Sequence, residues 1–129
     1  MAVWYHLTIR TPYDAQCPSA DVHVPPSSPW FNGHFPGHPI LPGVAQLGMV
    51  LDVLRHAREM PLRVVEVSRV RFKQMVLPDD HLVVTAEARP GKNDNYSFRI
   101  SKDEVLVCSG NMVVAAAGAK EAKDSAKGE

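Results

Sequence analysis

One stretch decides the fold of this chain: Trp30-Phe31-Asn32-Gly33-His34-Phe35-Pro36-Gly37-His38-Pro39-Ile40-Leu41-Pro42-Gly43-Val44-Ala45-Gln46-Leu47-Gly48-Met49-Val50-Leu51-Asp52-Val53-Leu54. Its first half carries prolines and glycines at short intervals up to Gly43. Proline lacks a backbone N–H and disfavours helix at the residue before it, so we expect a loop there. The helix breakers stop at Val44, and we expect a helix from there to about His56 or Arg58.

The predicted helix is apolar around most of its circumference rather than along one stripe. A helix with this pattern is enclosed by other elements, whereas a surface helix keeps a broad polar face. We therefore expect the helix to be almost wholly buried and to be wrapped by the rest of the chain. Its apolar residues are Val44, Ala45, Leu47, Met49, Val50, Leu51, Val53, Leu54 and Ala57.

After the helix, apolar and polar residues alternate with a period near two, which is typical of strands. Breaks at Leu77–Asp80, Pro90–Asn95 and Lys102–Glu104 divide this half into four strands that begin near residues 62, 82, 96 and 105. Their order along the chain predicts a four-stranded antiparallel meander. Gly110, inside the last strand, predicts a bulge or a close backbone approach.

The segment before the loop predicts two short strands. Aromatic and β-branched residues favour one over Ala2–Ile9, and Asp21–Val24 alternates like another before three prolines close it. One enclosed helix followed by antiparallel strands predicts an α+β domain whose sheet curls around the helix. A chain of 129 residues fits one domain, which we place over residues 1–117. Residues 118–129 contain no large apolar side chain, so we expect a disordered, charged tail.

Charge and cysteine content exclude several classes of protein. The 14 basic and 14 acidic residues give a formal net charge of zero, so nothing global favours a nucleic acid or a membrane as partner. Cys17 and Cys108 lack metal-ligand spacing and indicate a reducing compartment. Neither a signal-peptide pattern nor a membrane-spanning run is present, so we expect a cytoplasmic protein.

No metal and no nucleotide cofactor is expected. His34 and His38 are four residues apart, but the Phe-Pro-Gly between them cannot be helical, so they do not form a two-histidine metal face. A Gly-rich phosphate-binding loop and an alternation of strands with helices are both absent from the sequence. We therefore expect chemistry carried by side chains and backbone alone.

Two segments resemble those of a known family. The order His-Phe-Pro-x-x-Pro-x-x-Pro-Gly from His34 to Gly43 closely resembles the signature of the 3-hydroxyacyl-[acyl-carrier-protein] dehydratases of the FabZ and FabA kind. Val70–Asp80 is similar to the family's Arg-Phe-x-x-x-Val-x-Pro-Gly-Asp segment, with Asp79 in place of the usual glycine. The resemblance extends from about residue 30 to residue 115 and implies the hot-dog fold, a long central helix wrapped by a curled antiparallel sheet.

The resemblance implies roles for several residues. In the family a loop histidine, matched here by His34, removes the C2 proton of a 3-hydroxyacyl thioester. A backbone N–H near the helix start binds the thioester carbonyl, and this role falls on Gly43 or its neighbour Val44. An imidazole that titrates near neutrality suits the proton transfer, and a helix N-terminus stabilises the enolate-like charge. We expect the substrate to be lined also by Phe35, Gly48 and Phe72.

The helix acid is where this sequence departs from the family pattern. The family carries Glu or Asp fourteen residues after the histidine, where this chain has Gly48, and Asp52 stands where the family usually has Gln. At a rise of ~1.5 Å per residue the two positions lie ~6 Å apart, about twice the reach of a hydrogen bond. Asp52 therefore serves either as an acid that works through a bridging water or as an ion-pair partner of Arg55 or His56.

The leading hypothesis is dehydration of a 3-hydroxyacyl thioester, linked to acyl-carrier protein or coenzyme A, to the trans-2-enoyl thioester, in fatty-acid or polyene-type biosynthesis. An impaired subunit that binds acyl thioesters and pairs with a complete dehydratase is a second hypothesis, and a hot-dog thioesterase is a third. The resemblance implies a homodimer, or a heterodimer with another hot-dog subunit, because the histidine and the helix acid come from different subunits in that family. We therefore expect His34 at a two-fold interface, facing the helix start of the partner chain. An acidic carrier protein, or simply a solvated strand face, explains the basic cluster Arg63, Arg69, Arg71 and Lys73.

Overall fold

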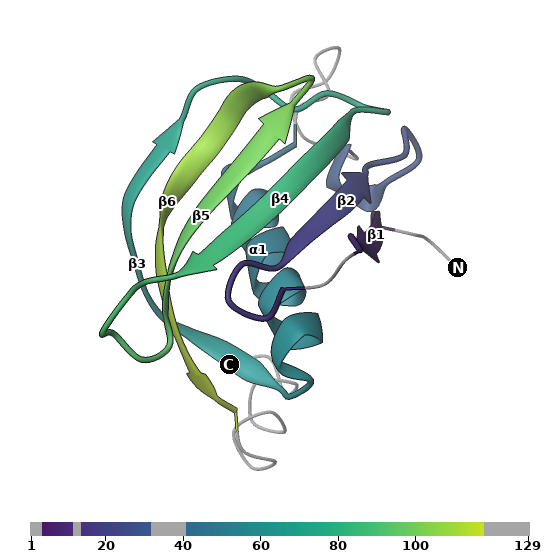
Figure 1. Cartoon of the computed structure of the whole chain (residues 1–129). Helices are drawn as coiled ribbons and strands as arrows, with labels where there is room; N and C mark the ends of the chain where they lie inside the picture. The colour runs from purple at the N-terminus through teal and green to yellow at the C-terminus, as the bar shows by residue number, and fades with distance from the viewer. Residues whose placement is uncertain (1–3, 12–13, 32–40, 118–129) are drawn as a thin grey trace.

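The computed structural model describes residues 4–11, 14–31 and 41–117 of the chain. The predicted tail 118–129 and the loop residues His34 and Phe35 lie outside these ranges, so the domain boundary at residue 117 stays a prediction. Six strands, one α-helix and one short 3-10 helix follow one another along the described chain (Figure 1): β1 (His6–Ile9), β2 (Ser19–His23), η1 (Pro29–Phe31), α1 (Gly43–Arg58), β3 (Leu62–Phe72), β4 (His81–Ala88), β5 (Asn95–Lys102) and β6 (Val105–Ala116).

Helix α1 has the bounds that the helix breakers predict. It begins at Gly43, directly after Pro42, whose extended backbone (φ −62°, ψ 150°) occupies the N-cap position. It ends at Arg58, because Glu59 adopts a left-handed conformation (φ 51°) that closes the last turn and Pro61 follows soon after. The basic residues of its last turn complement the negative end of the helix dipole. The helix prediction is confirmed.

The sheet does not have the predicted order. Its strands lie in the order β1-β2-β4-β5-β6-β3, every pair antiparallel, so β4, β5 and β6 form a meander but β3 pairs with β6. The four-stranded meander is therefore wrong in its first strand. The segment between β3 and β4 is not a hairpin, because its backbone bonds to other parts of the chain: Lys73 N–H to the Val107 carbonyl at 2.7 Å, and Asp79 N–H to the Val24 carbonyl at 2.7 Å.

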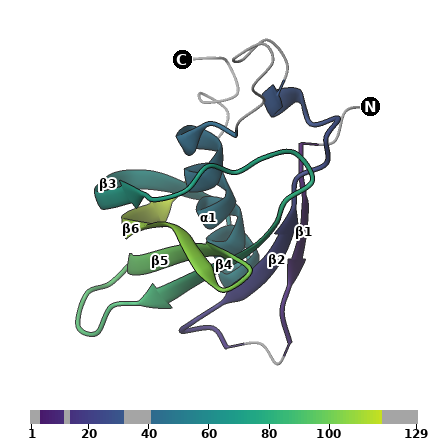
Figure 2. The ribbon, with the colours of Figure 1, turned by 90° about the horizontal axis from the view of Figure 1, so that it is seen from above.

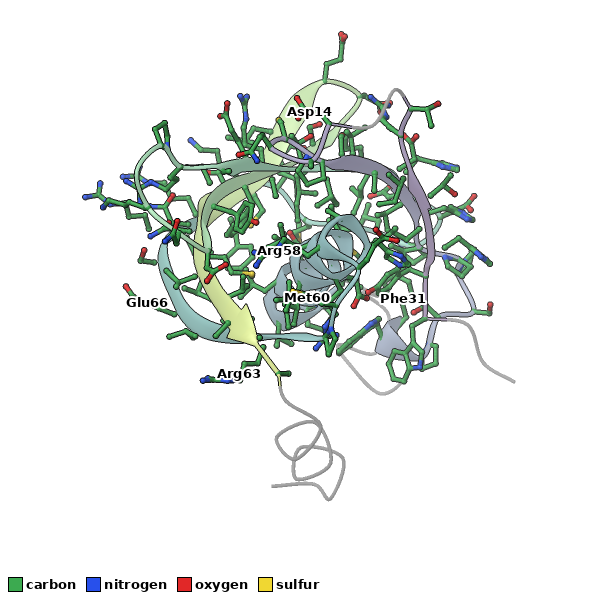
Figure 3. The ribbon with its side chains drawn as sticks, turned by 60° about the horizontal axis from the view of Figure 1, so that its bottom comes forward. Asp14, Phe31, Arg58, Met60, Arg63 and Glu66 are labelled. Carbon is green, nitrogen blue, oxygen red and sulfur yellow. The ribbon has the colours of Figure 1, made fainter. Side chains whose placement is uncertain are left out.

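The sheet curves around α1, with β3 and β1 at its two edges (Figures 1 and 2). Viewed along the helix, strands surround α1 on several sides (Figure 3). One face of α1 supplies buried side chains to a core that also includes Leu62, Leu82, Phe98 and Ile100. This arrangement confirms the α+β class with a curled antiparallel sheet. The helix residues buried in the core are Ala45, Gln46, Met49, Val50, Val53 and Leu54.

The expectation of an almost wholly buried helix is wrong for this chain. Val44 is 66% exposed, and Leu47, Gly48, Leu51 and Asp52 are all partly exposed. A single curved sheet has one concave face, so it covers one side of a helix and leaves the other side open. The apolar residues on the open side explain why the sequence pattern resembles that of an enclosed helix.

The predictions for the two N-terminal strands and for Gly110 agree with the structure. The predicted strands Ala2–Ile9 and Asp21–Val24 correspond to β1 and β2, with residues 1–3 outside the described ranges. The close backbone approach predicted at Gly110 is confirmed, since a Cβ there would lie 3.2 Å from the carbonyl oxygen of Ser68, and the side chain of Phe98 lies closer still, with Cζ at 2.8 Å. The register irregularity between Ser68 and Arg71 of β3 lies opposite Gly110, since these two residues pair with Asn111 and Ser109. No helix in the described ranges is long and apolar enough to cross a membrane.

Candidate active site

The start of α1 brings together three of the residues expected to bind substrate. A Cβ on Gly43 would lie 2.6 Å from Cζ of Phe72, so the ring of Phe72, at the end of β3, packs directly on the glycine backbone. Phe72 is 52% exposed and Val44, next to Gly43, is 66% exposed. Leu41 is anchored beside them by its N–H, which donates to the Val76 carbonyl at 2.8 Å. The result is an exposed apolar surface around a helix N-terminus.

The N-terminus of α1 has the electrostatics that an enolate-forming reaction needs. No side chain caps it, and no acidic residue lies in its first turn. The first N–H groups of a helix have no partner within the helix, and the aligned peptide dipoles place partial positive charge there. Backbone donors aimed at a carbonyl oxygen that gains negative charge stabilise the transition state. This end of α1 can therefore polarise a thioester carbonyl.

The position of the missing family acid is an open space. A Cβ built on Gly48 would meet no atom within 4 Å, and the residue is partly exposed. Four residues later the Asp52 side chain is 36% exposed. Both lie on the side of α1 that the sheet leaves open, so there is room beside them for a ligand or for a water molecule.

Asp52 is held by two hydrogen-bond donors, one on each carboxylate oxygen. The hydroxyl of Tyr5 donates to Oδ2, and Nη1 of Arg55 donates to Oδ1 at 3.3 Å. Arg55 is itself fixed, because its Nε and Nη2 donate to the Leu62 carbonyl at 3.1 and 2.9 Å. The ion pair with Arg55 that the sequence predicted is present, whereas the described contacts of Asp52 do not include His56.

Tyr5 keeps its proton at this contact. Burial first, and then the hydrogen bond to Asp52 and its charge, raise the pKa of Tyr5 well above its ordinary value. A phenol with a raised pKa stays neutral through the physiological range and acts as a hydrogen-bond donor. The Tyr5–Asp52 contact therefore does not depend on pH through the tyrosine.

A cavity of about 450 Å³ borders Asp52 on the side of the N-terminal segment. Its walls are Trp4, Tyr5, Trp30 and Asp52, and the two tryptophan rings meet edge to face with centroids 4.9 Å apart. The indole N–H of Trp30 is buried and finds no hydrogen-bond partner among the described residues. A second cavity of about 500 Å³, lined in part by Arg55, Met60 and Leu62, borders Asp52 on its other side.

Three aromatic residues of this cavity were not singled out from the sequence as site residues. Trp4 and Tyr5 stand out as an aromatic pair before β1, and Trp30 opens the proline-rich stretch, but no local pattern connects them with the helix. Tyr5 lies 47 positions from Asp52 along the chain. Only the packing of β1 and β2 beside α1 brings them to the same place (Figure 2).

Of the remaining candidates, Arg63 lines the second cavity together with Asp52, whereas three histidines form a separate group on the sheet. His6, His23 and His81 stack face to face across three neighbouring strands, with centroid separations of 5.9 and 4.4 Å, and Nε2 of His23 pairs with Asp79 at 2.7 Å. Among the residues that the structure places, no three metal-ligating side chains converge on a common point. Arg63 and Glu66, on the edge strand β3, point away from α1 (Figure 3).

Comparison with known proteins agrees with this geometry. A family model described as ApeI-like, the ApeI dehydratases, matches residues 11–111. The chain is 36% identical over 98 residues to a 3-hydroxyacyl-[acyl-carrier-protein] dehydratase FabZ of Syntrophomonas wolfei, an alignment that covers 69% of this chain and 68% of the relative.

Solved structures share the architecture. The dehydratase heterocomplex ApeI:P from Xenorhabdus doucetiae superposes with a TM-score of 0.73 at 23% identity, over 84% of this chain and 94% of the other. A thioesterase of Pseudomonas aeruginosa gives a TM-score of 0.59 at 14% identity, over 84% and 79% of the two chains. At these identities the likeness concerns the fold, and it confirms the hot-dog architecture.

Proposed function

The chain belongs to the ApeI-like dehydratase family, and we propose that it removes water from a 3-hydroxyacyl thioester, carried by acyl-carrier protein or coenzyme A, to give the trans-2-enoyl thioester. The observation that carries the proposal is the uncapped start of α1 beside Phe72, on the same open side of the helix as Gly48 and Asp52. The FabZ relative is by name a 3-hydroxyacyl-[acyl-carrier-protein] dehydratase, which supports the same class of substrate here.

The reaction divides among groups at this site. His34 takes the C2 proton of the substrate, while the N-terminal N–H groups of α1 hold the thioester oxygen as it gains charge. The electron pair of the C2–H bond forms the C2=C3 double bond, the C3–O bond breaks, and the hydroxyl leaves as water after it takes a proton. His34 lies outside the described residues, so its assignment comes from its place in the loop motif.

We propose that Asp52 is the acid that gives a proton to the leaving hydroxyl. It is the only carboxylate within α1 and lies one turn beyond the position where the family carries its acid. The open space at Gly48 can hold a water molecule that bridges Asp52 to the leaving hydroxyl. Such a water-mediated hydrogen bond is nearly as favourable as a direct one. Tyr5 and Arg55 then stabilise the carboxylate that Asp52 becomes after it gives up its proton.

His34→Ala tests the proposed base. We expect the rate of enoyl-thioester formation to fall by at least about 10²-fold, since general base catalysis typically contributes 10²–10⁴. His38→Ala is the matched control from the same loop and should retain activity within a factor of about three. Ultraviolet absorbance of the conjugated thioester follows the reaction, and circular dichroism checks that both variants fold. Full activity of His34→Ala would remove His34 from the reaction.

A second candidate function has a specific observation in its favour. Gly48 replaces the family acid with hydrogen, and the similar Xenorhabdus structure is a heterocomplex by its description. These two facts support a weakly active subunit that binds the acyl thioester and is completed by another hot-dog chain. The exposed edge strand β3, with Val64 and Val65 at its surface, offers the place for a second hot-dog subunit, identical or not.

Gly48→Glu distinguishes the two candidates. If the chain works as a dehydratase with weak acid assistance, a carboxylate at position 48 should raise the rate about 10-fold or more, since the structure has room for it. If the chain is a partner subunit with other defects, Gly48→Glu stays as slow as the wild type and activity appears only with a complete dehydratase. Release of free thiol in the same assay would instead indicate thioester hydrolysis.

A further inference from the structure

We infer that Tyr5 is a positioning residue for dehydration: its hydroxyl holds the Asp52 carboxyl group at the edge of the open space beside Gly48. The inference rests on the proposed function, because it assigns a partner to the acid of that reaction. The observation behind it is a direct hydrogen bond between two side chains that are far apart in sequence. Tyr5 comes from the segment before β1, and Asp52 comes from α1.

The sheet delivers Tyr5 to the helix. His6, the next residue, begins β1 and pairs with His23 of β2, and Leu7 pairs with Val22. Strand β2 pairs in turn with β4, so the position of Tyr5 is tied to the body of the sheet. Figure 2 shows β1 and β2 standing beside α1. Tyr5 therefore approaches Asp52 from a fixed direction, and not from a freely moving terminus.

The two donors on Asp52 act in different directions. Arg55 lies three residues further along the same helix and is bonded to the Leu62 carbonyl, so it draws the carboxyl group toward the C-terminal end of α1. Tyr5 binds the other oxygen from the side of the cavity that Trp4 and Trp30 line. With both donors present the carboxyl plane is fixed. With Arg55 alone, the carboxyl group has one anchor and can rotate.

The surroundings of Tyr5 hold its ring in place and keep its hydroxyl protonated, so that it stays a hydrogen-bond donor. Trp4 and Trp30 meet edge to face next to it, and burial keeps the phenol neutral. A carboxyl group that is 36% exposed and lacks this contact would sample several rotamers. A misplacement of about 1 Å in a reacting group can lower a rate by about 10²-fold, so this hydrogen bond bears on turnover more than on folding.

The test compares Tyr5→Phe with Tyr96→Phe. Tyr96 is the matched control, because its hydroxyl accepts a hydrogen bond from Nη1 of Arg58 at 3.0 Å at the far end of α1 and does not touch Asp52. Tyr5→Phe keeps the ring in the cavity wall and removes only the donor. We expect kcat to fall about 10- to 100-fold in Tyr5→Phe with KM within about threefold, and both constants to stay within about threefold in Tyr96→Phe.

Two further readouts separate positioning from a merely structural role. In an Asp52→Asn background, Tyr5→Phe should lower kcat by less than a further factor of about two, because both substitutions disable the same group. The midpoint of thermal unfolding should be nearly the same in Tyr5→Phe as in the Tyr96→Phe control, because the loss of the Tyr5 donor affects the reaction and not the fold. A residue that only holds β1 against α1 would lower the midpoint of thermal unfolding, and its effect on kcat would persist in the Asp52→Asn background.

Each outcome decides the inference. Full kcat in Tyr5→Phe, with Asp52→Asn inactive, overturns the role of Tyr5 and leaves the proposed function standing. Independent, multiplying effects of the two substitutions also overturn it. Full activity in Asp52→Asn overturns both the inference and the assignment of the acid, while dehydration itself remains. A wild-type chain that turns over no 3-hydroxyacyl thioester, alone or with a second hot-dog subunit, overturns the proposed function and the inference with it.

Discussion

Asp52 shows how much of a residue's function lies in its neighbours. The sequence presents it as an acid or as the partner of a cation one turn away, and the structure places it between Arg55 and Tyr5 with a third of its surface open. The ion pair does not exclude the acid role. A partly exposed carboxyl group with both oxygens bonded can still meet a water molecule, and an exposed pair of this kind contributes little stability by itself.

Cys108 offers a prediction at the residue scale. Burial raises the pKa of its thiol to about 11, above the value near 9 of an exposed thiol. The folded state therefore holds this proton more tightly, and the stabilisation is complete below about pH 9 and is lost as pH rises toward 11. We expect the free energy of unfolding in urea to fall more steeply between pH 9 and pH 11 in the wild type than in Cys108→Ala.

Cys17 is the internal control for a second measurement of Cys108 burial, by alkylation. It is only partly buried, and burial followed by the charges of Glu87 and Asp14 raises its pKa. An alkylating reagent at pH 8 should react with Cys17 in the folded protein and with Cys108 only after unfolding, as mass spectrometry of the peptides would show. If the free energy of unfolding has the same pH dependence in the wild type and in Cys108→Ala, the raised pKa assigned to the Cys108 thiol is contradicted.

At the scale of secondary structure, three glycines have three different uses. Gly43 lets the Phe72 ring rest on the start of α1, Gly48 leaves space on the open side of the helix, and Gly110 allows β6 to pass under the ring of Phe98. The sequence predicted a close approach at Gly110, but it did not name the ring of Phe98 or that of Phe72 as the group that each glycine meets. The neighbours of each glycine decide the cost of replacing it.

Alanine substitutions at two of these glycines should have opposite effects on stability. At Gly110 a methyl group would meet Phe98 at 2.8 Å and the Ser68 carbonyl at 3.2 Å, so we expect a loss of about 1–3 kcal/mol. At Gly48 the methyl meets nothing, and the higher helix propensity of alanine should add about 0.5–1 kcal/mol.

Chemical denaturation of the two variants beside the wild type measures both effects. Phe98→Leu should recover part of the loss caused by Gly110→Ala, because it removes the ring atoms that clash. A Gly110→Ala protein as stable as the wild type would show that the strand can shift at no cost. A destabilised Gly48→Ala protein would show that the space beside α1 is filled.

At the scale of the whole molecule, the curved sheet leaves two unsatisfied surfaces. One is the open side of α1, with the exposed Val44. The other is the outer edge of β3, where Val64 and Val65 are 38% and 52% exposed. An exposed edge strand has unpaired backbone N–H and C=O groups, so it is a template for another strand. Together they fit the proposed second hot-dog subunit, which would cover both the edge and the site.

A charge on the edge of β3 tests this proposal. Val65 falls at the register irregularity between Val64 and Glu66 and lies at the surface. We expect Val65→Lys to shift the protein from dimer to monomer in analytical ultracentrifugation and to lower dehydration with it, because lysine on an edge opposes strand pairing. Val105→Lys, at a valine that is 46% exposed on β6, is the control and should leave the dimer intact.

Periodicity and breakers along the chain determined which segments are helical and which are extended, since these properties depend on neighbours a few residues apart. The bounds of α1 and the four strands of the second half follow from them, and the loop motif with its resemblance was enough to expect a hot-dog dehydratase with His34, Gly43 and Gly48 at its site.

Only the tertiary structure decided that β3 lies beside β6, that one side of α1 stays open, and that Phe72 rests on Gly43. It also decided that Tyr5 reaches Asp52 across 47 positions of the chain. A sequence pattern reports which face of an element is apolar, but it does not name the partner that the face will meet. Those partners are chosen by the packing of all elements at once.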